Sequence, residues 1–199
     1  MLARHLQKIP ASLTWLDIRA HAVTICIAIA AAAVSIAVAP NASGILAAGL
    51  ALTVTMIAAI DARYFIIPDE LSAVALALGL VHATLVGYSA LEAIGLAMLR
   101  GLALALIFLA VRAAYLRLRG RQGIGLGDVK LAAVAGVWLD WYMMPVAVDI
   151  AAVTALAVYV ARQLALGRSI RSKGRLPFGL FFAPAIWVGW VLDVWLLAS

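Results

Sequence analysis

Two aspartates, Asp61 and Asp128, have the residue type and the setting for chemistry in this chain. Asp61 closes one apolar run, and Asp128 opens another in the stretch GIGLGDVKLAAVAG (residues 123–136), where a carboxylate is costly to keep. Two carboxylates held close together cannot both ionise cheaply, so they share one proton. The ionised member then takes a proton from water as general base, while the protonated member polarises a carbonyl as general acid. Such a pair hydrolyses an amide bond without a metal or a covalent intermediate.

Other catalytic groups are sparse in the sequence. Cys26 is the only cysteine, which excludes a disulfide within the chain and a four-cysteine zinc site. The three histidines, His5, His21 and His82, are too scattered along the chain to suggest a shared metal ion. We therefore expect no metal and no cofactor.

The composition indicates a membrane protein. Of the 199 residues 67% are hydrophobic and 12% are charged, whereas soluble domains are roughly half apolar and about a quarter charged. Charged and turn residues divide the chain into runs close to the ~20 residues with which a helix crosses a bilayer. The sequence therefore predicts an all-α polytopic membrane protein, with a cytoplasmic or interfacial segment at 1–21 and a transmembrane domain at 22–199. The seven predicted spans are 22–39, 44–60, 71–88, 93–111, 127–143, 146–164 and 178–198.

The basic residues indicate how these spans are oriented. If the spans alternate in direction, every Lys and Arg except Arg100 falls on one side of the membrane. By the positive-inside rule that side is cytoplasmic, so the N-terminus lies inside and Asp61 and Asp128 lie at the same cytoplasmic depth. The topology then explains the net charge of +6 without nucleic acid as a partner. The basic loops also attract anionic membrane lipids.

A charge within a predicted span is costly and is a candidate for function, and three such residues stand out. They are Arg100, Asp149 and Asp193. A structural role is the simpler interpretation of each. Asp149 and Glu92 are the candidate partners of Arg100, and the sequence does not decide whether either contact forms.

Three motifs around the two aspartates resemble those of one known family. Residues 125–128 read GLGD and match the GxGD motif of membrane aspartyl proteases, and GLGDVKL is similar to the bacterial prepilin peptidases in particular. The other aspartate opens a segment that fits the pattern D-x-[RK]-x-x-x-[IL]-P-[DN] of that family, through Asp61, Arg63, Ile67, Pro68 and Asp69. The stretch LPFGLFFAPA (residues 176–185) resembles the family's IPFGPFL element. The resemblance covers roughly residues 40–198 and implies that Asp61 and Asp128 are the catalytic pair.

The resemblance also implies a substrate and a location. Prepilin peptidases are aspartic endopeptidases of the bacterial inner membrane, and they cut a short basic leader peptide from type IV or Tad prepilins and from pseudopilins at the cytoplasmic face. Longer members carry an N-terminal domain with two CxxC pairs, which is linked with N-methylation of the new terminus. This sequence has no CxxC pair, and it resembles the compact Tad-type form without that zinc and methyltransferase domain.

Charged residues near the aspartates have two interpretations each. Asp69 and Glu70 stand at the start of a predicted span, where they either cap the helix or attract the Lys and Arg residues of a substrate leader. Lys130 either extends to the membrane interface or lowers the pKa of a catalytic aspartate.

The remaining candidates are small or conformationally special residues. Gly125 and Gly127 leave backbone room beside Asp128 for an extended substrate. Pro177, Phe178 and Gly179 either shape the entry to the last span or, as the resemblance implies, lie near the active site.

Two other functions compete with proteolysis. A small proton-coupled transporter would use membrane carboxylates to carry protons, but such acids are expected near the bilayer midplane on broken helices, often within repeated halves. The predicted position of Asp61 and Asp128 is the cytoplasmic end instead, and no repeat is visible. A catalytically silent scaffold in a pilus or secretion machine is the third possibility, and the sequence leaves it open.

Overall fold

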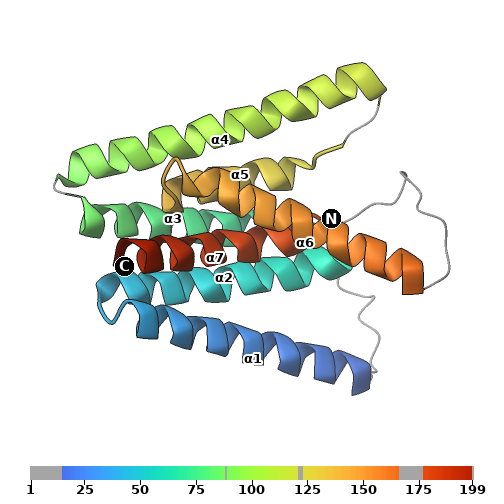
Figure 1. The fold of residues 1–199 in the computed structure, drawn as a ribbon, viewed down its shortest axis with the longest axis horizontal. Coiled ribbons are helices and arrows are strands. Elements are labelled where there is room, and N and C mark those ends of the chain that lie inside the picture. The colour runs from blue at the N-terminus through green and yellow to red at the C-terminus, as the bar shows by residue number, and fades with distance from the viewer. Residues whose placement is uncertain (1–14, 88, 121–122, 166–176, 199) are drawn as a thin grey trace, which may run out of the picture.

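The computed structural model describes residues 15–198 apart from 88, 121–122 and 166–176 (Figure 1). The described chain consists of helices joined by short turns and loops, which confirms the predicted all-α class. Its helices are α1 (Trp15–Val38), α2 (Ala42–Tyr64), α3 (Asp69–Val86), α4 (Ala90–Arg119), α5 (Leu126–Trp138), α6 (Met143–Ala165) and α7 (Gly179–Ala198). Each of the seven predicted runs overlaps one of them. The basic residues at 168–175 lie outside the described part of the chain.

Six of these helices are long and apolar enough to cross a bilayer, and α5 is the exception. Its 13 residues rise only about 20 Å, against a hydrocarbon core of about 30 Å. The predicted span 127–143 is interrupted because the helix ends at Trp138, and a turn through Asp140 leads directly into α6. At the other end of the chain, the described part of the expected N-terminal segment, from Trp15, continues α1 without a break.

The short helix α5 lies at the centre of the bundle. It packs against α3, α4 and α7, while α1 packs against α2 and α6 against α7 (Figure 1). Leu131, Ala132 and every residue from Val134 to Leu139 are buried. Because α5 is enclosed, its first turn is held in place by neighbouring helices as well as by its own backbone.

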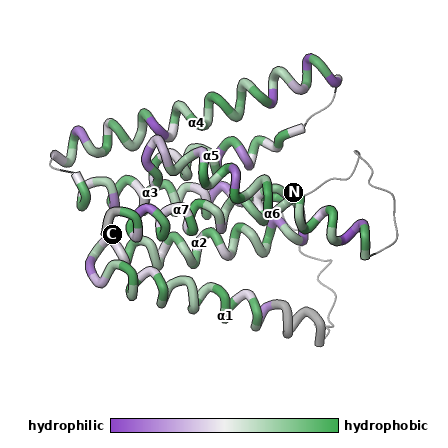
Figure 2. The backbone as a smooth tube through the Cα atoms, in the orientation of Figure 1, coloured by the Kyte–Doolittle hydropathy of each residue, from purple (hydrophilic) through white to green (hydrophobic). Residues whose placement is uncertain are grey.

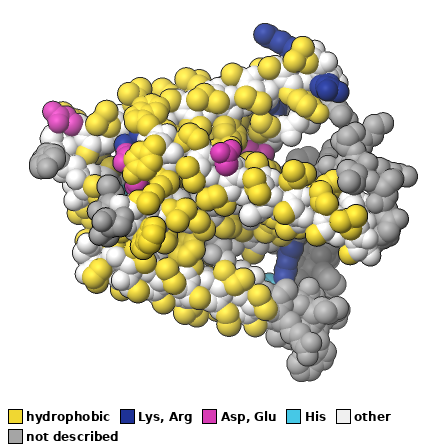
Figure 3. All heavy atoms as spheres, viewed as in Figure 1, with side chains coloured by type: hydrophobic (Ala, Val, Ile, Leu, Met, Phe, Trp, Pro, Cys, Tyr) yellow, Lys and Arg dark blue, Asp and Glu magenta, His cyan; other side chains and the backbone are white. Residues whose placement is uncertain are grey.

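The outer surface of the bundle is apolar. Large hydrophobic side chains such as Ile25, Val81, Leu102 and Val153 are exposed on four different helices. Hydrophobic residues run along every helix in Figure 2, and they cover most of the face shown in Figure 3. A soluble protein would expose such an area only at a cost, whereas lipid tails cover it without one. The described chain is therefore built as a multi-pass membrane bundle.

Candidate active site

Asp61 and Asp128 lie at the same end of the bundle. Helices α2 and α5 run in opposite directions, with Asp61 in the last turn of α2 and Asp128 in the first turn of α5 (Figure 1). We call this end of the bundle the aspartate end. The opposite end, where α5 stops and α6 begins, we call the far end.

Asp61 is held by the beginning of α7. The residue is only 5% exposed, and its Oδ2 accepts a hydrogen bond from the backbone N–H of Leu180 at 2.9 Å. The first N–H groups of a helix have no partner within the helix, and the helix dipole is positive there. The N-terminus of α7 therefore supports a carboxylate at this point without a cationic side chain.

Asp128 is held by the beginning of its own helix. Gly125 is the N-cap of α5, and its N–H donates to Oδ2 of Asp128 at 3.0 Å. Helix α5 is not one of the six helices long enough to span a bilayer, and Asp128 lies in its first turn at the rim of the bundle. Burial raises the pKa of Asp128 to about 6, the hydrogen bond from Gly125 opposes the rise, and the charge of Asp61 adds to it. The two carboxylates are thus electrostatically coupled.

Ile67 joins the two helix beginnings. A Cβ atom on Gly127 would lie 2.9 Å from Cδ1 of Ile67, and one on Gly179 would lie 2.8 Å from the same atom and 2.9 Å from Oδ2 of Asp61. Both positions therefore require glycine for close approach. The buried Ile67 side chain contacts α5 through Gly127 and α7 through Gly179, so that Asp61 and the first turn of α5 share one neighbour.

The turn after α2 directs Ile67 inward. Phe65 ends the helix with a φ of 56°, in the left-handed region, and its N–H donates to the carbonyl of Asp61. A non-glycine residue in this region is strained by roughly 1 kcal/mol. Phe65 and Ile66 are exposed and Ile67 is buried, so the turn places only the last of the three against the site.

The charged candidates next to the aspartates form an ion pair. Nζ of Lys130 on α5 contacts Oδ1 of Asp69 at the start of α3, and both side chains are largely exposed. Glu70, also in the first turn of α3, is exposed. The N-cap of α3 is Pro68, without a side-chain cap. The charge of Lys130 is therefore directed to Asp69, and Glu70 faces solvent at the aspartate end.

The residues that precede α7 connect it to α4. Pro177 and Phe178 are half-buried, and the ring of Phe178 packs on Phe182 with centroids 5.4 Å apart. Phe182 in turn stacks on Phe108 of α4 at 5.4 Å. This column of rings fixes the position of Gly179 and Leu180, which contact Asp61.

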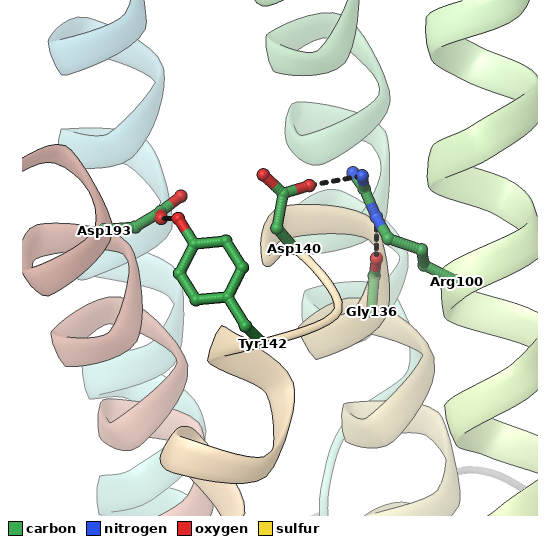
Figure 4. A network of polar contacts seen from close by, with 5 residues as sticks. All are labelled: Arg100, Gly136, Asp140, Tyr142 and Asp193. Carbon is green, nitrogen blue, oxygen red and sulfur yellow. Dashed lines mark hydrogen bonds and ion pairs between the residues drawn. The ribbon is translucent and has the colours of Figure 1, made fainter. Parts of the chain in front are cut away.

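At the far end, a second group of charged residues forms different contacts (Figure 4). Arg100 donates from Nε to the carbonyl of Gly136 at 3.2 Å and from Nη1 to Oδ1 of Asp140 at 2.5 Å. Beside it, the hydroxyl of Tyr142 donates to Oδ1 of Asp193. Arg100 therefore pairs with Asp140 and not with either candidate partner from the sequence, Asp149 or Glu92.

Asp140 is available to Arg100 because α5 ends early. The guanidinium binds a free carbonyl in the last turn of α5 and the carboxylate of the turn that follows. Asp149 lies on an exposed part of α6. No sequence signal marks Asp140 as a partner, because the predicted span 127–143 runs through this residue without a turn.

One contact at the aspartate end joins two residues that lie outside the three sequence motifs. Nη1 of Arg112 on α4 donates to the carbonyl of Ile124 at 2.5 Å, immediately before the N-cap of α5. In the sequence Arg112 is one of several loop arginines that suggest topology alone. Among the described residues, no group of three or more His, Cys, Asp and Glu side chains is arranged to hold a metal ion.

Known proteins with similar sequences relate this chain to one family. Residues 46–160 match the type IV leader peptidase family. The prepilin leader peptidase/N-methyltransferase of Aeromonas hydrophila is 31% identical over 150 residues, which are 74% of this chain and 49% of that protein. The protein of the same name from Burkholderia pseudomallei strain K96243 is 35% identical over 144 residues, 72% of this chain and 45% of that protein.

A shorter stretch is similar to a third relative. The leader peptidase HopD of Escherichia coli is 42% identical over 77 residues, 38% of this chain and 49% of that protein. This chain thus spans about half the length of the curated relatives it matches. No solved structure matches it significantly. The family match over more than half of its length shows that the chain belongs to the type IV leader peptidase family.

Proposed function

We propose that this protein is an aspartic endopeptidase that removes the basic leader peptide from type IV or Tad prepilins, or from pseudopilins, at the cytoplasmic face of the bacterial inner membrane. The observation that carries the proposal is the support of two coupled carboxylates, Asp61 and Asp128, by backbone N–H groups at two helix beginnings. Membership of the leader peptidase family supports the same reaction.

The reaction uses the single proton that the pair shares. The ionised aspartate takes a proton from a water molecule, and the water oxygen attacks the carbonyl carbon of the scissile peptide bond. The protonated aspartate gives its proton to the carbonyl oxygen. When the tetrahedral intermediate collapses, the C–N bond breaks and the leaving amine nitrogen takes a proton from the aspartate that had acted as base. One hydroxyl of the intermediate returns its proton to the other aspartate, so that a carboxylic acid forms and the pair again holds a single proton. Two helix N-termini near the carboxylates favour the negative charge on the pair.

The substrate leader is basic, and exposed acids at the aspartate end complement it. Glu70 faces solvent in the first turn of α3, and the Asp69–Lys130 pair is itself largely exposed. An incoming Lys or Arg side chain interacts with Glu70 and exchanges with Lys130 for Asp69. Exposed ion pairs are worth at most about 1 kcal/mol, so this exchange costs little. These acids therefore act on substrate affinity and not on the chemical step.

A cleavage assay in detergent tests the proposal. The purified protein is incubated with a pilin peptide that carries its basic leader and apolar helix, and with a matched peptide whose leader Lys and Arg are replaced by Gln. We expect cleavage at the leader junction of the first peptide and a higher KM for the second. If neither peptide is cut and the reconstituted protein carries a proton flux that depends on Asp61 and Asp128, the protein is a transporter and the proposal is wrong.

A further inference from the structure

One peptide group connects an arginine of α4 to Asp128. The carbonyl of Ile124 accepts from Nη1 of Arg112 at 2.5 Å, and the N–H of Gly125 donates to Oδ2 of Asp128 at 3.0 Å. This carbonyl and this N–H belong to the same planar amide. The guanidinium and the carboxylate are therefore bonded to opposite ends of one peptide dipole.

The two hydrogen bonds strengthen each other. A cation on the carbonyl oxygen draws electron density toward that oxygen and makes the N–H on the other side a better donor. Hydrogen bonds to charged groups are roughly twice as strong as neutral ones, and here both ends of the amide contact a charged group. The rotation of the peptide plane is also fixed, because turning it breaks both bonds at once.

We propose that Arg112 is a positioning residue for Asp128: through the Ile124–Gly125 peptide it fixes the direction of the N–H that binds the carboxylate and favours the ionised form of that carboxylate. This inference rests on the proposed function of Asp128. Arg112 does not contact substrate or water in the reaction, and its effect passes through one peptide group.

The geometry of α4 supports this role. Arg100 precedes Arg112 on the same helix and binds the carbonyl of Gly136 at the other end of α5. Arg100 and Arg112 are the same number of residues apart in α4 as the carbonyls of Gly136 and Ile124 are in the antiparallel segment that contains α5. Helix α4 therefore holds the α5 segment at both ends, and the contact at the aspartate end is the one made by Arg112. A shift of about 1 Å at a reacting group can cost about 100-fold in rate.

Few charged groups face Asp128 among the described residues. Asp61 approaches from α2 and raises its pKa. Lys130 lies on α5 itself, and its charge is paired with Asp69 of α3. The half-buried Arg112 of α4 is thus the cation that is linked to Asp128 by hydrogen bonds through the Ile124–Gly125 peptide. Removing this cation should raise the pKa of Asp128, because it removes support for the charged form.

The experiment compares three variants of the full chain in detergent. Arg112→Gln removes the charge, Arg112→Lys keeps a charge and a donor, and Arg117→Gln makes the same charge change at an exposed arginine near the end of the same helix. For each, kcat and KM for a leader-bearing pilin peptide are measured from pH 4 to pH 9, together with the thermal unfolding midpoint.

We expect Arg112→Gln to lower kcat roughly tenfold with KM within about twofold, because the contact acts on the reacting group and not on substrate affinity. Its rate profile should move to higher pH by about half a unit or more. Arg112→Lys should recover part of both effects, and Arg117→Gln should resemble the wild type.

Three results would overturn the inference while the proposed function stands. They are an unshifted profile for Arg112→Gln, an equal shift for Arg117→Gln, or a loss of rate that follows the loss of thermal stability at every pH. If Arg112→Gln does not fold, Arg112→Lys decides: a small upward shift agrees with the role, and a lowered kcat without any shift contradicts it. A wild type that does not cleave overturns the proposed function instead.

Discussion

The two ends of the bundle use the same residue types for different purposes. At the far end, Asp140 and Asp193 bind the side chains of Arg100 and Tyr142 (Figure 4). At the aspartate end, the donors described for Asp61 and Asp128 are the backbone N–H groups of Leu180 and Gly125. Both arrangements make a carboxylate tolerable inside a membrane protein.

The two arrangements differ in whether the carboxylate can still exchange a proton. A guanidinium neutralises the charge of its partner and ties it to one structural contact. A backbone N–H orients a carboxylate and supports its charge, but it leaves the carboxylate free to gain and lose a proton. Burial of Asp128, together with the charge of Asp61, raises the pKa of Asp128 to about 6. Side-chain partners thus favour structure, and main-chain partners favour chemistry.

Replacing Asp61 or Asp128 should have the largest effect. Asp61→Asn and Asp128→Asn should each lower cleavage by about 1,000-fold or more, because neither group can do the work of the other. Asp149→Asn and Asp193→Asn, made as controls in the same assay, should keep most activity. An equal loss in Asp193→Asn would mean that the two ends do not differ in function.

Crowding the aspartate end should come next. Gly179→Ala places a methyl group against Ile67 and Asp61, and a displaced Asp61 should lower kcat by about 100-fold. Gly95→Ala is the matched control, since an added Cβ there meets nothing within 4 Å. Full activity of Gly179→Ala would show that the spacing between Ile67 and Asp61 is not critical.

At the far end the expected loss is of stability. Arg100→Gln should lower the free energy of unfolding by about 1–3 kcal/mol, since Asp140 loses its partner in a partly buried pair. The kcat of the protein that remains folded should fall less than threefold. Stability follows from the unfolding midpoint in detergent, and a kcat loss as large as that of Gly179→Ala would assign the far end a catalytic part.

The smallest effect is expected from Tyr142→Phe. It removes one exposed hydrogen bond to Asp193, which is worth about 1 kcal/mol or less. Cleavage should not change, and the unfolding midpoint should fall by a few degrees at most. A greater loss than that of Arg100→Gln would mean that Tyr142, and not Arg100, holds the far end together.

Much of the fold could be predicted from the sequence, because in a membrane protein the apolar runs determine the helices. The shared end of Asp61 and Asp128 also followed from the alternation of those runs. The length of α5 could not be predicted, since apolar residues continue on both sides of Asp140 where the structure ends the helix with a turn.

The residues around the aspartates were only partly predictable. Motif spacing singled out Gly127, Ile67 and Gly179, but their mutual contact depends on how three helices meet. The donors from Leu180 and Arg112 are a backbone group and one arginine among many, and neither leaves a pattern in the sequence.

The sharpest test compares the double variant Asp61→Asn/Asp128→Asn with each single variant in one cleavage assay. If the two aspartates share a proton and act as a unit, each single variant already loses nearly all activity. The double variant should then be no more than about threefold worse than either. Substantial cleavage by one single variant, or a double loss equal to the product of the two single losses, would contradict the shared-proton mechanism.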